Sequence, residues 1–352
     1  MNQRSYQLSK IPAAKTKIIA EIGLSHEGSL GLAIALAKSA IQHGANIVKF
    51  QAHFSEFESS KSEKFRTQFS HQDSTRWDYW SRTGFSYENW IYLKGQVEAA
   101  GGIFAVSVFS KSALEFFLDQ GVQIIKLGSG DLNNEELLSG LQDYAGTILL
   151  STGLATEMEI HTAANWLVEH SSNIDSALLQ CTSKYPTILT QVGINVMKGI
   201  NDKYKIKSGL SDHTVGITSS LAAIMHGADY LEKHFVLSKE MFGPDVICSI
   251  TPQELEFITN FRDEYEQVMV NVDKDKLAIE LTETKQVFNR SLGLIRPMKS
   301  GEVPTEQDFC LRKPGGGLEW SSRSELVGKP LLKDCDLDEL LTLNHFQIKT
   351  IK

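Results

Sequence analysis

Polar and ionisable residues stand at the carboxyl ends of segments that otherwise have the composition of buried strands. They are Glu21 in IIAE, Lys49 and Gln51 in NIVKFQ, Lys126 and Ser129 in IIKLGS, and Glu232 and His234 in YLEKHF. Packing alone would favour apolar residues at these positions. In a parallel (β/α)₈ barrel the strand interiors fill a closed core, whereas the carboxyl ends of the strands and the following loops build one shared active site. The pattern therefore predicts such a barrel, with its functional residues gathered at one mouth.

Strand and helix patterns alternate along the chain, as repeated βα units require. Helical segments such as 30–42 and 86–100 separate the strands. Several helices end in glycine, as at Gly44, Gly101 and Gly227, where a left-handed C-cap turns the chain back to the barrel. The predicted strands are 18–21, 46–50, 103–106, 123–127, 147–151, 177–181, 207–211 and 229–234. This alternation predicts an α/β fold, a (β/α)₈ TIM barrel.

The chain is longer than a barrel requires, since it has 352 residues and one barrel needs roughly 250. Beyond Arg290 the sequence pattern changes to short β segments with turn residues. We predict a barrel domain over 1–276, a linker helix over 277–289 and a small β-rich domain over 290–352. A domain of about 60 residues is marginal alone, so docking onto a barrel, its own or a partner's, would help to stabilise it.

Composition narrows the class of protein. With 41% hydrophobic and 22% charged residues the chain is typical of a soluble globular protein. The net charge is −8 and no run of Lys and Arg is interleaved with aromatic residues, so we expect small-molecule partners and no nucleic acid. The N-terminus MNQRSYQLSK lacks the apolar stretch of a signal peptide, and no run is long enough to span a membrane, which favours a cytoplasmic enzyme. Four widely spaced cysteines make no CxxC pair and are expected to be reduced thiols.

The connection from about 52 to 85 is too long for an ordinary loop. Its aromatic and basic residues suggest an element that covers substrate, although a packing loop at the edge of the barrel is an equally good interpretation. These residues are Arg66, Arg76, Trp77, Tyr79, Trp80 and Arg82.

His213 in GLSDHT and His234 in LEKHF form the candidate metal site, because they follow adjacent strands. Two neutral imidazoles with open remaining positions suit a divalent ion that acts as a Lewis acid on a carbonyl. A structural, hydrogen-bonded role is the alternative for each ring. Glu232 and Asp212 beside them are either partners that fix the imidazole tautomers or satisfied strand-end carboxylates.

Lys49 and Lys126 interrupt apolar runs near strand ends, which suggests an anionic ligand. With hydroxyl donors they would hold a phosphate and a carboxylate in the barrel mouth. One lysine could instead form a Schiff base, or each could pair with Glu21 or Asp131 across the barrel. The candidate hydroxyl donors are Ser107, Ser129, Ser151, Thr152 and Ser211.

Two carboxylates remain from the residues alone. Glu21 ends the first strand, and Asp245 lies in the turn MFGPDVICS after the eighth. Either could hydrogen-bond sugar hydroxyls or move a proton. Asp245 could equally cap its own turn.

An ordered series of motifs carries a family resemblance. The segment IIAEIGLSHEGSLGLA is followed by GANIVKFQ, IKLGSGD, STG, CTSKYPT, GLSDHTVG, LEKHF and GPD. Together they resemble the sialic acid synthase family, the phosphoenolpyruvate-dependent enzymes that make nonulosonic acids. The tail RSLGLIRPMKSGEVPTEQDFCLRKPGGGLEW resembles the family's C-terminal antifreeze-like (SAF) domain.

The resemblance implies that C3 of phosphoenolpyruvate attacks the aldehyde of an open-chain, unphosphorylated N-acyl mannosamine-type sugar, while water adds at C2 and phosphate leaves. His213 and His234 would hold Mn²⁺ or Mg²⁺, and the family dimer would bring a basic residue of the C-terminal domain, here Arg312, to the partner's N-acyl group. Glu21, Asp131 and Asp245 would face the acceptor sugar or manage protons. The phosphoenolpyruvate site would be lined by Lys49, Ser107, Lys126, Ser129, Ser151, Ser183 and Ser211, with Gln51 and Tyr185 nearby.

The chain departs from the family pattern at several positions. It has His26-Glu27 in place of HN, Asp131 in place of glutamate, Ser183 in place of the asparagine of sialic acid enzymes, and Lys313 rather than arginine directly before PG. Ser183 is similar to the pseudaminic acid branch, whereas KFQ and GPDVICS are more like the sialic acid branch. The alternatives are therefore a legionaminic or pseudaminic acid synthase with a diacetylated acceptor, an enzyme that uses a phosphorylated sugar, and a non-catalytic carbohydrate- or ice-binding protein.

Overall fold

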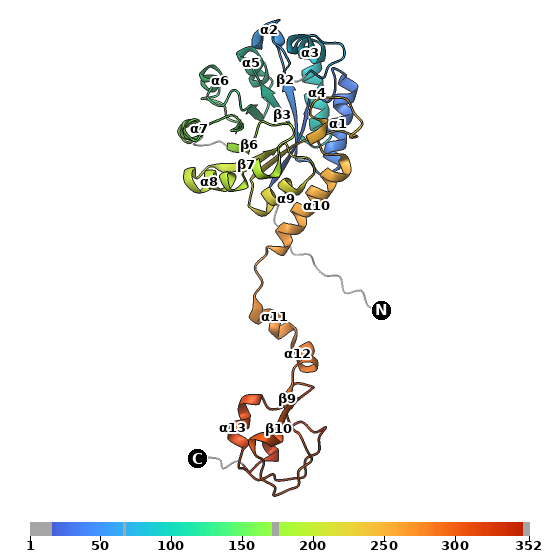
Figure 1. Ribbon diagram of the computed structural model, residues 1–352, viewed down its shortest axis with the longest axis vertical. Coiled ribbons are helices and arrows are strands. Elements are labelled where there is room, and N and C mark those ends of the chain that lie inside the picture. The colour runs from blue at the N-terminus through green and yellow to red at the C-terminus, as the bar shows by residue number, and fades with distance from the viewer. Residues whose placement is uncertain (1–15, 66–67, 171–175, 348–352) are drawn as a thin grey trace. The chain divides into compact units, whose positions relative to one another are not determined.

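The computed structural model of the protein describes residues 16–65, 68–170 and 176–347 (Figure 1). Arg66 and the end of the predicted small domain, 348–352, lie outside these residues. The chain divides into two compact units, and the division falls between Met269 and Val270, ahead of the predicted boundary at 276. Each unit is described by itself.

The first unit contains a closed barrel that, in the described residues, has eight parallel strands in sequence order. Figure 1 shows helices arranged around these strands, and each predicted strand is present. The strands are β1 (Lys17–Gly23), β2 (Ile47–Ala52), β3 (Ile103–Val108), β4 (Ile124–Leu127), β5 (Thr147–Ser151), β6 (Ala177–Cys181), β7 (Lys207–Asp212) and β8 (Tyr230–His234). The longer helices are α1 (Leu30–Gln42), α4 (Tyr87–Ala99), α5 (Lys111–Asp119), α7 (Glu157–His170), α8 (Ile194–Tyr204), α9 (Thr218–Met225) and α10 (Pro252–Val268), with the short α6 (Glu135–Gly140) between β4 and β5. The predicted barrel is confirmed.

Alternation along the strands sorts the side chains between two faces. Outward-facing residues such as Val48 and Phe50 pack against the helices in one large apolar cluster. Inward-facing residues fill the closed core of the barrel in a second, smaller cluster, formed by Ile19, Ile47, Ala105, Ile124, Leu149, Ala177, Leu179 and Tyr230. Two residues further along seven of these strands, the inward position is polar, and these side chains form a polar layer at the carboxyl end of the barrel. The polar layer consists of Glu21, Lys49, Ser107, Lys126, Ser151, Ser211 and Glu232.

Glycine ends several barrel helices in the way the sequence predicts. Gly44, Gly101 and Gly227 have φ angles of 91°, 88° and 79°, in the left-handed region that favours glycine. The amide of Gly44 donates to the carbonyl of Ile41 in the last turn of α1. The chain then enters β2 directly, which explains why the connection is short.

The connection from β2 to α4 contains two helices, α2 (Ser55–Glu58) and α3 (Arg76–Thr83). Thr75 and Asp78 form a capping box at the start of α3, in which each side chain accepts the other's backbone amide. The long segment that the sequence singles out is therefore partly helical.

The second unit begins with two short helices, α11 (Lys274–Glu280) and α12 (Thr282–Phe288), where a single helix over 277–289 is predicted. Its strands β9 (Ser291–Leu294) and β10 (Phe309–Arg312) pair in antiparallel fashion, and α13 (Arg323–Leu326) follows. A separate apolar cluster, which includes Leu292, Leu294 and Phe346, forms its core. The predicted short β segments are present, and the antifreeze-like identity of this unit stays a prediction.

Candidate active site at the barrel mouth

Lys49 occupies an inward-facing position of β2 and is almost fully buried. Its ammonium lies 2.6 Å from Oε2 of Glu21 and donates a hydrogen bond of 2.8 Å to Oγ of Ser107. Register explains the group, because Glu21 of β1 is paired with Lys49. The structural pairing of Lys49 with Glu21 that the sequence allows is thus present, inside the polar layer.

Lys126 of β4 pairs with Glu232 of β8 rather than with Asp131. The Lys126 ammonium lies 2.5 Å from Oε1 of Glu232, and Oγ of Ser211 donates to the same oxygen at 3.1 Å. The second oxygen of Glu232 lies 3.7 Å from the ammonium of Lys49. The two lysines and two carboxylates therefore form one buried group across the barrel.

Electrostatics keep Lys126 and Glu232 ionised. Burial would lower the pKa of Lys126, but Glu232, with lesser contributions from Cys181 and Glu21, raises it above its usual value. Burial would raise the pKa of Glu232, yet Lys126 and Lys49 outweigh it and lower this pKa to about 2. The Lys126 ammonium is thus kept charged by a buried carboxylate.

Hydroxyl groups surround the lysines on neighbouring strands. Ser151 of β5 is 2% exposed, and its Oγ has no hydrogen-bond partner within the described residues. Oγ of Ser129 accepts from the amide of Gly153 at 2.9 Å. The hydroxyls of Ser129 and Ser183 and the thiol of Cys181 converge on the space that a side chain at Gly153 would fill. Glycine at 153 therefore keeps this space open, beside groups that can donate to an anion.

His213 and His234 are brought together as predicted, with ring centroids 5.5 Å apart and both rings almost fully buried. The ring of Tyr185 lies 4.1 Å from that of His213. Asp245 places Oδ2 3.8 Å from Nδ1 of His234. Two imidazoles, a phenol and a carboxylate therefore share one side of the mouth.

The protonation of His213 suits a metal ligand. Burial, with a further contribution from His234, lowers the pKa of His213 to about 3, so the ring is neutral near pH 7. Nδ1 of His213 lies 3.1 Å from the carbonyl oxygen of Thr182, which assigns the proton to this nitrogen. Nε2 then keeps its lone pair, and such an outer hydrogen bond is typical of a ligating histidine. The donor set of His213 and His234, with Asp245 close by, fits a divalent metal ion.

Asp212 and Glu232 do not set the histidine tautomers. Asp212 faces outward, where its Oδ2 lies 3.0 Å from the Lys233 ammonium and accepts from Ser219 and Ser220 of α9. Glu232 contacts Lys126 and lies near Lys49. The interpretation of Asp212 as a satisfied carboxylate is therefore the one that the structure supports.

Gln51 contacts the polar layer, whereas Asp131 contacts its own loop. Nε2 of Gln51 donates to Oε1 of Glu21 at 2.8 Å, so the amide is fixed against the polar layer. Asp131 accepts from Nδ2 of Asn134 at 2.9 Å, and partial burial raises its pKa above the usual value. Asp131 is consequently easier to protonate than an ordinary aspartate.

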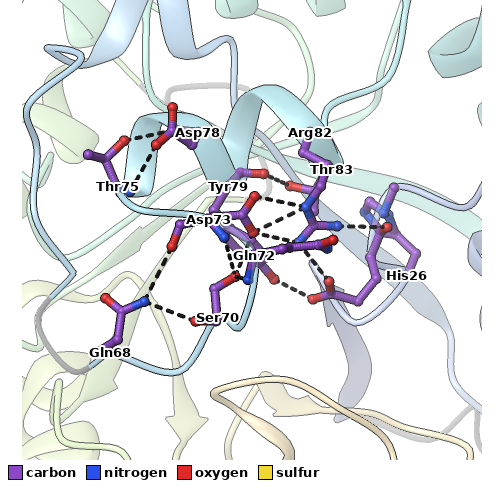
Figure 2. Close-up of polar contacts among 12 residues, drawn as sticks. His26, Gln68, Ser70, Gln72, Asp73, Thr75, Asp78, Tyr79, Arg82 and Thr83 are labelled. Atoms are coloured by element: carbon purple, nitrogen blue, oxygen red, sulfur yellow. Dashed lines mark hydrogen bonds and ion pairs between the residues drawn. The ribbon is translucent and has the colours of Figure 1, made fainter.

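The segment after β2 is anchored beside the mouth by Arg82 (Figure 2). Arg82 donates to both carboxylate oxygens of Asp73, and its Nη2 lies 3.0 Å from Oε2 of Glu27 in the loop after β1. The hydroxyl of Tyr79 donates to Oε1 of Glu27 at 2.7 Å. Phe69 packs against Phe242 of the loop after β8, with ring centroids 6.0 Å apart. The segment thus contacts loops from both β1 and β8, whereas its covering of a substrate stays a prediction.

Arg312 belongs to the second unit. Its Nε donates to the carbonyl of Leu294, and its side chain lines a pocket of about 430 Å³ together with Arg290, Lys313 and Asp338. Three of the side chains that line this pocket are basic. Contact of Arg312 with a sugar stays a prediction.

A second group of potential metal ligands lies in this unit, where ligand atoms of Cys335, Glu339 and His345 come within 4.8 Å of one another. Nδ1 of His345 accepts from the amide of Thr342 at 3.0 Å, so the N–H of the ring is on Nε2. Nε2 lies 3.0 Å from Oε1 of Glu339, to which it then donates. The ring has no lone pair to offer, and we assign this group to a hydrogen-bonded helix cap. All four cysteines of the chain are free.

The chain is similar to several known proteins. The model of the NeuB family matches residues 36–274. The chain belongs to the NeuB family, a sialic acid synthase-like family. The N,N'-diacetyllegionaminic acid synthase of Campylobacter jejuni is 30% identical over 93% of this chain and 99% of its own length. The N-acetylneuraminate-9-phosphate synthase of Drosophila melanogaster is 31% identical over 92% of this chain and 93% of its own.

A solved structure has a similar fold. The N-acetylneuraminic acid synthetase of Leptospira borgpetersenii, in complex with citrate, is 27% identical, covers 76% of this chain and 92% of its own, and has a TM-score of 0.65. Within the described residues of this NeuB family member, no helix is both long and apolar enough to cross a membrane.

Proposed function

We propose that the protein condenses phosphoenolpyruvate with an unphosphorylated N-acyl amino sugar of the mannosamine type to give a nonulosonic acid and phosphate. One observation carries the proposal: two buried lysines and two buried histidines lie together at the mouth of the barrel. The lysines suit a small polyanion, and the histidines suit a divalent ion beside it. Membership of the NeuB family agrees with this pairing.

Phosphoenolpyruvate would lie over the polar layer. The ammonium groups of Lys49 and Lys126 would donate charge-assisted hydrogen bonds to its carboxylate and phosphate, supported by Ser107 and Ser211. Three further hydroxyls, those of Ser129, Ser151 and Ser183, would take the remaining anionic oxygens. Ser151 is the best placed for this because its buried hydroxyl has no partner within the described residues.

The acceptor sugar would bind on the histidine side. A divalent ion held by His213 and His234 would polarise the aldehyde oxygen as a Lewis acid. Asp131, which burial makes easier to protonate, would supply a proton to the new hydroxyl, while Glu21 and Asp245 would orient the sugar hydroxyls. Gln51 and Tyr185 would define the wall between the two substrates.

The balance of the reaction is simple. A bond forms between C3 of phosphoenolpyruvate and the aldehyde carbon, and water adds at C2. The bond between C2 and the phosphate oxygen then breaks, and inorganic phosphate leaves. The product is a keto acid that contains the carbons of both substrates.

A diacetylated sugar is the second candidate acceptor. Its support is similarity, because the Campylobacter jejuni relative covers nearly the whole chain and is named a diacetyllegionaminic acid synthase. Because the chain is also similar to the Drosophila N-acetylneuraminate-9-phosphate synthase, a phosphorylated acceptor is a further candidate. We further propose that 290–352 is an antifreeze-like SAF domain and that a homodimer brings Arg312 to the acceptor of the partner barrel.

Phosphate release tests the proposal. Purified protein with Mn²⁺ and phosphoenolpyruvate would be assayed with N-acetylmannosamine, with its 6-phosphate, with the diacetylated sugars of the legionaminic and pseudaminic routes, and without sugar, and products identified by mass. We expect release that depends strictly on one sugar, which then names the acceptor. Equal release with and without every sugar would instead indicate a phosphatase and refute the condensation.

A further inference from the structure

Glu232 lies between the two lysines of the polar layer, and its role goes beyond burial of a single ion pair. Its carboxylate is 3% exposed. One oxygen contacts Lys126 at 2.5 Å and the other lies 3.7 Å from Lys49, while Ser211 donates to the first. One side chain therefore touches or approaches both cations that the proposed substrate requires.

The two lysines depend on Glu232 to different extents. In the described residues Lys49 has a second carboxylate, Glu21 at 2.6 Å, and the hydroxyl of Ser107. The ion pair that the described part of the chain gives Lys126 is with Glu232. Lys126 comes from β4 and Glu232 from β8, so the contact crosses the barrel interior instead of following the strand pairing.

A long, flexible side chain needs such a contact to present its charge at a defined point. Lysine has a four-carbon stem, and two ammonium groups at one site repel each other. A carboxylate between them would reduce the repulsion and limit the rotamers of both stems, so that less freedom is lost when an anion binds.

We infer that Glu232 is a positioning residue that holds the ammonium groups of Lys126 and Lys49 ready for the carboxylate and phosphate of phosphoenolpyruvate. This inference rests on the proposed function. It requires no contact between Glu232 and the substrate, because Glu232 acts through the lysines.

The neighbouring pair Asp212–Lys233 offers a matched control. It joins β7 to β8, it is as buried as the Lys126–Glu232 pair, and its atoms are 3.0 Å apart, but it faces the helices outside the barrel. A purely structural role for Glu232 predicts that the loss of either carboxylate has the same consequences. A positioning role predicts that they differ.

The test is calorimetric titration of phosphoenolpyruvate into the full-length protein with Mn²⁺ present. We expect Glu232→Gln to raise the Kd at least about tenfold, whereas Asp212→Asn leaves it within twofold, although both lower the unfolding temperature. Glu232→Asp, which keeps the charge but withdraws it by one carbon, should also weaken binding. In a Lys126→Met background Glu232→Gln should weaken binding much less than in the wild type, and the KM for the sugar should stay within twofold in Glu232→Gln.

The outcomes distinguish failure of the proposed function from failure of the positioning role of Glu232. A wild type that does not bind phosphoenolpyruvate refutes the proposed function itself. Wild-type affinity in Glu232→Gln or in Glu232→Asp, with binding by the wild type intact, overturns the positioning role alone. Equal loss in Glu232→Gln and Asp212→Asn, or full additivity with Lys126→Met, would likewise show that Glu232 only stabilises the fold.

Discussion

Replacement of Lys126 by methionine separates binding from stability, because the barrel contains a second buried lysine with the opposite orientation. Lys126 is 5% exposed and pairs with Glu232 at 2.5 Å inside the mouth. Lys233 is 1% exposed and pairs with Asp212 at 3.0 Å on the outer face of the strands. Methionine has a similar length in both places and removes the charge.

The expected magnitudes follow from these contacts. Removing one partner of a buried ion pair costs about 3–5 kcal/mol, and we expect the lower end in both variants because each remaining carboxylate keeps hydroxyl donors. Only Lys126→Met also removes a charge-assisted hydrogen bond to substrate, worth about 1.5–3 kcal/mol. At 1.4 kcal/mol per tenfold change, this raises the Kd for phosphoenolpyruvate roughly 10- to 150-fold.

Two measurements check this reasoning, namely chemical denaturation and calorimetric titration with phosphoenolpyruvate. Lys126→Met should lose stability and affinity, whereas Lys233→Met should lose stability and keep wild-type affinity. Unchanged affinity in Lys126→Met, or equal losses of affinity in both variants, would refute the assignment of the anion site to the polar layer.

Three further predictions concern the metal, pH and the segment after β2. His213→Ala and His234→Ala should each abolish metal-dependent phosphate release while circular dichroism stays that of the wild type; full activity in either would exclude the two-histidine site. Burial would raise the pKa of Asp212, but Lys233 and the α9 hydroxyls outweigh it and lower this pKa. The ionised carboxylate therefore stabilises the fold above its unfolded pKa near 4, and this stabilisation is lost as the pH falls through the folded pKa. The stability difference between wild type and Asp212→Asn, about 3 kcal/mol at pH 7, should therefore shrink below about pH 4 in urea unfolding, and a constant difference would contradict the ion pair. Arg82→Met removes the bonds to Asp73 and Glu27, so amides of 68–83 should exchange hydrogen faster while those of the barrel strands do not; unchanged exchange would contradict the anchor.

The barrel and its polar layer could be predicted because one physical rule produces both. In a strand, successive side chains point to opposite faces, so a polar residue two positions after an inward apolar one must also face inward. Ile47 and Lys49 show this relation in β2, and Tyr230 and Glu232 show it in β8. Glu232 carries the same signal in the sequence as Lys49, and its place in the polar layer could have been anticipated from it.

The remaining contacts depend on distances that alternation does not fix. The sequence could not show that Lys126 meets Glu232 rather than Asp131, because that choice crosses the barrel between strands that do not pair. Alternation places Asp212 on the outer face of β7, but it does not fix the partner there, which is Lys233. Two helices in place of one at 274–288 reflect the break at Leu281 between Glu280 and Thr282, which composition alone did not mark.

The central claim is that the barrel mouth joins phosphoenolpyruvate to a sugar with loss of phosphate from carbon. The most direct measurement is mass spectrometry of a reaction with phosphoenolpyruvate that carries ¹⁸O in the oxygen bridging C2 and phosphorus, the sugar that supports release, and Mn²⁺. We expect the label to leave in inorganic phosphate and a keto acid containing the carbons of both substrates to form in equal amount. Release of unlabelled phosphate, with pyruvate in place of the combined keto acid, would contradict the central claim.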